Sequence, residues 1–121
     1  MEARAVRKYV RISPRKARVI ANAVRGKRVP EAMSILGFLP HRAAKPVERA
    51  LNDAVHNLMD KYPDERFDED QLVIRAIYVN EGPMYKRYRP APRGRAHRIR
   101  RRTSHITVVV GLQNELVEQE V

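Results

Sequence analysis

The sequence predicts a single domain, residues 1–121, that combines helices with antiparallel strands. Two late segments, residues 72–80 and 106–112, are rich in β-branched side chains and are typical of strands. Residues 41–61 repeat apolar side chains at the i, i+3/i+4 spacing of an amphipathic helix. A chain of 121 residues is long enough for one such domain and too short for two.

The N-terminal part predicts a strand followed by a helix. Residues 3–12 roughly alternate between apolar and basic side chains, which indicates a strand. The next segment carries helix end signals. Ser13 can cap the first turn, Pro14 fits the first helical position, and Gly26 fits the residue just past the end.

The middle of the chain predicts two more helices. A short helix after Pro30 should end near Gly37 or Pro40. The helix over residues 41–61 should carry Pro46 in its first turn or be kinked there. The side chains expected to face inward are Ala32, Ile35 and Leu36 in the short helix and Val47, Leu51, Ala54, Val55 and Leu58 in the long one.

The two late strands are expected to form the base of one long β-hairpin. The point halfway between their midpoints falls near Pro92 and Arg93. There the sequence PAPRG supplies two prolines and a glycine, which are typical of a chain reversal. The simplest interpretation is an extended hairpin arm over residues 82–104.

The net charge of +11 is concentrated in two blocks. Residues 1–30 carry ten Lys or Arg and one Glu, and residues 85–105 carry nine Lys or Arg and no acid, so each block is +9. Residues 31–84 are net −4 and residues 106–121 are net −3. Two separated basic blocks indicate a polyanionic partner that contacts two regions of the chain. A membrane surface is the competing polyanion, but it favours a basic helix with an apolar face, which the second block lacks.

Three conformations of the stretch 85–105 compete. A disordered, solvated loop is how most charge runs behave. A basic helix is possible in its second half, because Arg95, Arg98 and Arg102 fall at i, i+3 and i+7. An extended ribbon would carry charge on both faces, and a surrounding polyanion would order it.

The composition of this stretch favours an arm that binds nucleic acid. It contains eight Arg and one Lys, and Arg offers a planar fork for phosphate and can stack on bases. Tyr85 and Tyr88 add ring faces for bases or sugars, so irregular RNA suits the arm better than a regular duplex. The helix that begins after Ser13 is expected to be a second contact, through its free amides, Arg15 and Lys16. An ordinary solvated helix face is the alternative there.

Metal sites and catalytic sites are not indicated. The acidic cluster over residues 64–70 lacks the glycine and the ligand spacing of a calcium loop. The four His have no paired-ligand spacing, and without Cys no common zinc pattern can be built. Ser104 and His105 are adjacent, so in a strand they point to opposite faces. We therefore expect no enzyme, no cofactor, no metal and no small-molecule substrate.

Nothing in the chain predicts a membrane location. No apolar run approaches the roughly 20 residues of a membrane-spanning helix, and the N-terminus MEARAVRKYV is charged throughout. The absence of Cys fits a reducing compartment. A cytoplasmic protein is the expectation.

Two motifs carry a family resemblance. They are YVRISPRKARVIANAVRGK near the start and YVNEGPMYKRYRPAPRGRAHRIRRRTSHITVVV near the end. In their order and spacing they resemble the bacterial large-subunit ribosomal protein twenty-two family. The resemblance implies an α+β fold, with a three-stranded antiparallel sheet, three helices and a long protruding β-hairpin. It also implies a structural constituent of the large subunit that binds its ribosomal RNA at several domains and supports early assembly.

The resemblance further implies a position at the peptide exit tunnel. The globular part would lie near the exit, and the hairpin would line the wall beside the nascent peptide, near a constriction shared with the fourth large-subunit protein. Macrolide antibiotics bind further up this tunnel. The matching tunnel-lining positions are Tyr85, Lys86, Arg87, Tyr88, Pro92, Arg93, Gly94, Arg95 and Ala96. A free-standing regulatory protein that binds RNA or DNA is the alternative function.

We expect RNA contacts from both basic regions. In the N-terminal region they are Arg11, Ser13, Arg15, Lys16, Arg18, Arg25, Lys27 and Arg28. In the arm they are Lys86, Arg87, Arg89, Arg93, Arg95, Arg98, Arg100, Arg101, Arg102, Thr103, Ser104 and His105. The chain departs from the family at Ala91-Pro92, where Arg-Ala is usual, so one tip charge is lost. Its acidic ending, with Glu115, Glu118 and Glu120, is expected to point to solvent.

Overall fold

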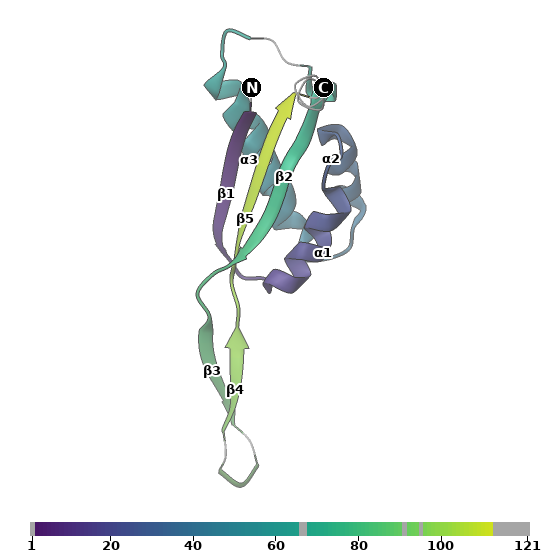
Figure 1. Cartoon of the computed structure of the whole chain (residues 1–121). Helices are drawn as coiled ribbons and strands as arrows, with labels where there is room; N and C mark the ends of the chain where they lie inside the picture. The colour runs from purple at the N-terminus through teal and green to yellow at the C-terminus, as the bar shows by residue number, and fades with distance from the viewer. Residues whose placement is uncertain (1, 66–67, 91, 95, 113–121) are drawn as a thin grey trace.

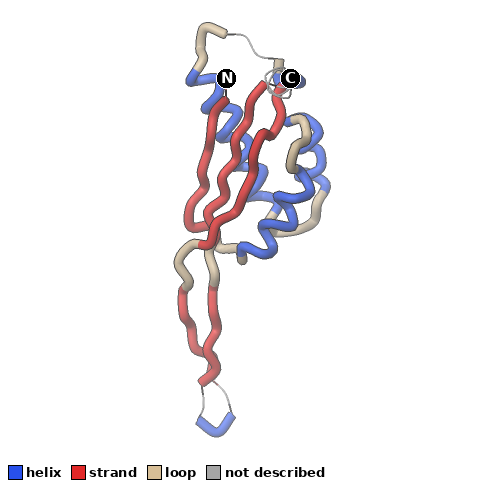
Figure 2. Tube along the Cα trace, viewed as in Figure 1, coloured by secondary structure: helices blue, strands red, loops and turns tan. Residues whose placement is uncertain are grey.

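Strands form two separate antiparallel sheets in the computed structural model, which describes residues 2–65, 68–90, 92–94 and 96–112. The larger sheet consists of β1 (Glu2–Val10), β2 (Leu72–Glu81) and β5 (Ser104–Leu112), in the order β1-β5-β2. The smaller consists of β3 (Tyr85–Pro90) and β4 (Ala96–Arg101), which project from one end of the larger sheet (Figures 1 and 2). The expected α+β class with a three-stranded antiparallel sheet is confirmed.

Three helices, α1 (Pro14–Val24), α2 (Val29–Phe38) and α3 (Ala44–Lys61), cover one face of the three-stranded sheet. The predicted end signals of α1 are confirmed: Ser13 Oγ accepts a hydrogen bond from Lys16 N at 3.4 Å, and Gly26 follows the helix with φ +76°. The predicted start of α3 at residue 41 is wrong by three residues. The preceding residues form a turn, in which the amide of Ala44 donates to the carbonyl of His41 at 3.0 Å.

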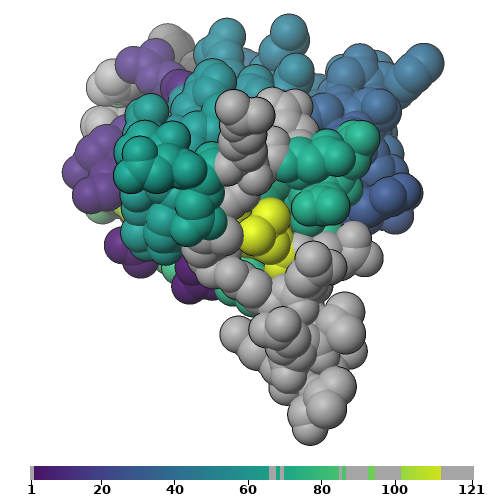
Figure 3. Space-filling model, turned by 90° about the horizontal axis from the view of Figure 1, so that it is seen from above, coloured from purple at the N-terminus to yellow at the C-terminus, as the bar shows by residue number. Residues whose placement is uncertain are grey.

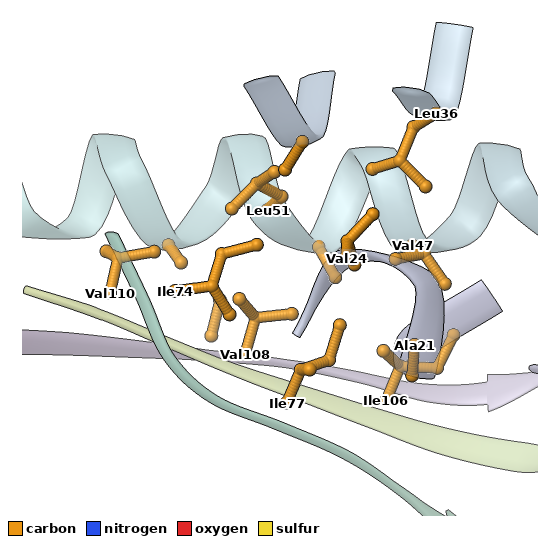
Figure 4. Packing of buried hydrophobic residues seen from close by; sticks show 14 of the residues in the cluster. Ala21, Val24, Leu36, Val47, Leu51, Ile74, Ile77, Ile106, Val108 and Val110 are labelled. Atoms are coloured by element: carbon orange, nitrogen blue, oxygen red, sulfur yellow. The ribbon is translucent and has the colours of Figure 1, made fainter. Parts of the chain in front are cut away.

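The hydrophobic core lies between the sheet and the helices (Figure 4). Helix α3 packs across β1 and β5, and α1 packs against β2. The central strand β5 points Ile106, Val108 and Val110 at the helices, and each is fully buried. Burial of such a side chain stabilises the fold by about 1.5–3 kcal/mol. On β1 the inward residues are the small Ala3 and Ala5, which let α3 approach closely.

Most of the predicted core residues of the helices are buried. Ala32 and Leu36 in α2 are buried, while Ile35 is only partly so. All five predicted apolar residues of α3 are buried. Strand β5 spans the whole domain, from the base of the small sheet to the opposite end. Figure 3, seen from that opposite end, shows the last described atoms of β5 (yellow) reaching the surface.

Candidate nucleic-acid interface

The two basic blocks of the sequence meet at the end of the domain where the arm leaves. There, β1 ends, α1 begins, and β2 and β5 continue towards β3 and β4 (Figure 1). The hydroxyl of Ser104 donates to the carbonyl of Ile12 at 2.5 Å. Three residues before Ile12, the amide of Tyr9 donates to His105 Nδ1 at 3.1 Å. Side-chain to backbone bonds therefore tie the first basic block to the base of the second.

A β-bulge near the end of β1 lies next to this junction. The register of β1 against β5 shifts between Arg7 and Val10. Within the shift, Tyr9 has φ 57°, in the left-handed region that few residues other than glycine adopt. Its ring meets the ring of His105 edge-on, with centroids 5.0 Å apart at 89°. A bulge of this kind bends and twists a strand, so it redirects the chain out of the sheet and into α1.

The arm leaves the sheet through a close approach of its two strands. The amide of Gly82 donates to the carbonyl of Thr103 at 3.0 Å, and Thr103 Oγ1 donates to the carbonyl of Pro83 at 2.6 Å. A Cβ added at Gly82 would overlap Thr103 Oγ1. Thr103 is 2% exposed and Ser104 is 0% exposed. Both hydroxyls, which the sequence analysis assigned to RNA, are thus used inside the protein. We call the residues Tyr9, Ile12, Gly82, Pro83, Thr103, Ser104 and His105 the neck.

Of the three conformations considered for the arm, the structure shows the extended ribbon. Strands β3 and β4 pair in register from Tyr85 opposite Arg101 to Pro90 opposite Ala96. The chain reverses over Pro92–Gly94, as predicted, with Arg93 at φ 63° and Gly94 at φ 71°. The predicted RNA-binding or tunnel-lining residues in the paired strands are Tyr85, Lys86, Arg87, Tyr88, Arg89, Ala96, Arg98, Arg100 and Arg101. Lys86, Arg93 and Arg102 are exposed, and Arg95 lies outside the described residues.

Two arginines, Arg18 in α1 and Arg25 at its C-terminal cap, have a role that sequence analysis did not find. Arg18 donates to the carbonyl of Val79 from both Nε (3.3 Å) and Nη2 (3.1 Å), and Arg25 donates to the carbonyl of Ile77 at 2.8 Å. Strand β2 is an edge strand, so these carbonyls have no neighbouring strand to bond. Further along the same edge, the carbonyl of Lys27 accepts from the amide of Ile74 at 3.0 Å. Satisfying an edge in this way protects it from pairing with another chain.

The remaining predicted residues of the first block face solvent. Arg11, Arg15, Lys16 and Arg28 are exposed, and Lys27 is half-buried beside Glu31, with 3.7 Å between Nζ and Oε1. Ser13 lies at the cap of α1. Arg11, Ser13, Arg15 and Lys16 lie at the end of the domain from which the arm leaves. Lys27 and Arg28 lie beside Val73 and Ile74, near the opposite end of β2.

The comparison with known families decides the identity. A family model described as ribosomal protein L22p/L17e matches residues 5–111. The chain belongs to this family. The match runs through β1, all three helices, the arm and β5, so it covers the sheet and the arm alike. The family expected from the two motifs is confirmed.

Curated relatives of this chain are similar to it over most of their length. The large ribosomal subunit protein uL22 of Salinibacter ruber is 46% identical over 119 residues, 98% of each chain. That of Desulfitobacterium hafniense (strain DSM 10664 / DCB-2) is 50% identical over 109 residues, 90% of this chain and 93% of the relative. That of Deinococcus deserti is 49% identical over 112 residues, 93% of this chain and 78% of the relative. A member of this family is a structural protein of the ribosome and not an enzyme.

Among the residues that the structure describes, no helix is both long and apolar enough to cross a membrane. No group of three or more His, Asp or Glu side chains in the described part of this L22p/L17e chain is placed to hold a metal ion.

The neck is the part of the site that sequence reasoning missed. The sequence identified Gly82 only as the first residue of the expected arm. Its contact with Thr103 depends on the pairing of segments about 20 residues apart. A positive φ at Tyr9 has no sequence signal, because Tyr does not favour that conformation.

Proposed function

We propose that this chain is a structural constituent of the large ribosomal subunit in the cytoplasm, and that it binds the RNA of that subunit through both basic blocks. The observation that carries the proposal is the meeting of the two blocks at the end from which the arm projects. The bond between Ser104 and Ile12 joins them directly. A single basic end with a protruding ribbon can enter folded RNA while the rest of the domain stays outside.

The geometry of the arm supports this proposal. About half of its backbone groups pair across β3 and β4, and the others face outward along the two edges of the ribbon, where solvent or RNA can bond them. Figure 1 shows it projecting beyond the helices and the larger sheet. Arginine binds phosphate through a planar fork, and phosphate contacts fix the position of a protein on nucleic acid.

The predicted contact residues differ in whether their side chains are bonded within the protein. Thr103 and Ser104 hold the neck, and Arg18 and Arg25 cap the edge of β2. Arg18 and Arg25 are exposed as well, but their guanidinium groups are bonded to β2. The RNA contacts that we favour are the other exposed basic residues among the predicted contacts: Arg11, Arg15, Lys16, Arg28, Lys86, Arg93 and Arg102.

The finer role follows the family resemblance. The globular part lies near the exit of the peptide tunnel, and the arm lines the tunnel wall near the fourth large-subunit protein, where the nascent peptide passes. By contacting several RNA domains at once, the protein supports early subunit assembly. It performs no catalysis and needs no cofactor.

The salt dependence of RNA binding tests the central claim. If the protein makes about ten phosphate contacts, log affinity for large-subunit RNA should fall with log salt at a slope of roughly −7 to −9. A nearly flat dependence would contradict the proposal. Sedimentation separates the regulatory alternative, because a subunit constituent stays with large subunits stoichiometrically at high salt and a free-standing regulator does not.

A further inference from the structure

A basic hollow lies at the start of α1, beside the neck. It is formed by the residues before α1, the first turns of that helix and the loop between α2 and α3. Its volume of about 440 Å³ falls in the range of roughly 300–1,000 Å³ that is typical of small-ligand sites. Ile12, whose carbonyl accepts the bond from Ser104, is one of its lining residues. The hollow therefore opens at the same end of the molecule as the arm.

The lining combines cations with an apolar wall. Arg11, Lys16, His41 and Arg42 are basic and exposed, and none of the described residues that line the hollow is acidic. The wall includes Ile20, which is 2% exposed, and Val19, which is 60% exposed. A ligand that covers Val19 would remove apolar surface from water, which favours binding by about 25 cal/mol for each Å² buried. The ligand that fits this lining has both an anionic part and a flat apolar part.

A nucleotide has both parts. We propose that the hollow holds one unpaired nucleotide of the large-subunit RNA, with its phosphates on Arg11, Lys16 and Arg42 and its base between Val19 and the ring of His41. Unpaired bases splay out of RNA and stack on aromatic rings, including histidine, whereas paired bases in an A-form helix are not available to a hollow of this kind. An acidic peptide would match the cations, but its carboxylates would leave the valine wall uncovered.

This inference rests on the proposed function and adds three residues to it. Val19 lies within the first motif but was not among the expected contacts. His41 and Arg42 come from the acidic middle of the sequence, outside both motifs. The loop between α2 and α3 brings His41 and Arg42 beside α1, and the bond from Ala44 N to His41 O closes the turn before α3.

Binding of large-subunit RNA to purified variants tests the assignment. His41→Ala should weaken binding by about fivefold to a hundredfold, the usual range for loss of a base stack, and should leave the salt slope unchanged. Arg42→Gln should weaken binding and reduce the slope by about one, as the loss of one phosphate contact does. Arg49→Gln, an exposed arginine of α3 outside the hollow, is the matched control. Denaturant unfolding of each variant confirms that the fold is kept.

A photo-reactive side chain at position 19 identifies the occupant. In assembled large subunits it should cross-link to an unpaired RNA nucleotide. A cross-link to a protein, or none, overturns the proposal. If wild-type protein binds RNA with a steep salt slope while His41→Ala and Arg42→Gln bind equally well, the hollow proposal fails and the proposed function stands. If the wild-type protein does not bind the RNA, both fail.

Discussion

The hydroxyl of Ser104, in the first residue of β5, donates to the carbonyl of Ile12, just before α1, at 2.5 Å. The two residues are 92 positions apart, and Ser104 is completely buried. This bond joins the base of the arm to the segment that leads into α1. The direction of the arm relative to the first basic block therefore depends on packing inside the domain.

Ser104→Ala should destabilise the protein by about 1–3 kcal/mol, because it leaves the buried carbonyl of Ile12 without its partner. Urea unfolding followed by circular dichroism measures the loss. Ser34→Ala is the matched control, since Ser34 is exposed and its hydroxyl bonds within helix α2 to the carbonyl of Pro30. The control should change stability by less than about 0.5 kcal/mol. Equal stabilities for the two variants would show that the buried bond contributes nothing.

Gly82→Ala should cost about 1–3 kcal/mol, the usual penalty for overpacking, because the new methyl group overlaps Thr103 Oγ1. Thr103 cannot move away easily, since it is 2% exposed and bonded to Pro83. In contrast, Gly37→Ala meets no atom within 4 Å and lies in α2, so it should stabilise by up to about 1 kcal/mol.

A double mutant isolates the contact at Gly82. Adding Thr103→Ala to Gly82→Ala removes the overlapping oxygen, so the two substitutions together should cost less than the sum of their separate costs. Strict additivity would place the strain elsewhere in the neck.

Arg25→Met should cost about 1 kcal/mol of stability, because the carbonyl of Ile77 on the sheet edge loses its donor. Arg15→Met, at an exposed arginine in the first turn of α1, should leave stability within about 0.5 kcal/mol. RNA binding should show the reverse order, with the salt slope reduced by about one for Arg15→Met and less for Arg25→Met. If Arg25→Met and Arg15→Met had equal effects on stability and on the salt slope, Arg25 and Arg15 would not have the different roles inferred from the structure.

Deletion of residues 85–101 should leave a cooperatively folded domain, because the neck closes the hairpin before the arm begins. Met84 would then join Arg102 in a short loop above the Gly82–Thr103 pair. The deletion removes eight basic residues, so RNA affinity should fall steeply and its salt slope should flatten. Subunits assembled with it should show altered macrolide sensitivity. Loss of cooperative unfolding in urea would instead make the arm part of the core.

Much of the fold could be predicted from local signals in the sequence. Ser13, Pro14 and Gly26 marked the ends of α1, and β-branched runs marked β2 and β5. The reversal at Pro92–Gly94 followed from the midpoint between those strands and from its turn residues. These features depend on backbone propensity and on periodicity within one segment, so they are visible without the rest of the chain.

What the sequence by itself determined was the set of elements, the two basic blocks and the family. Only the tertiary structure decided which basic side chains remain free to bind RNA. Arg18 and Arg25 have the same sequence character as Arg15, yet their guanidinium groups are bonded to the edge of β2. Likewise, Ser104 has an ordinary polar side chain in the sequence and is completely buried in the fold. The physical reason is that burial and hydrogen-bond partners come from segments 50 to 90 residues away, whose approach no local pattern records.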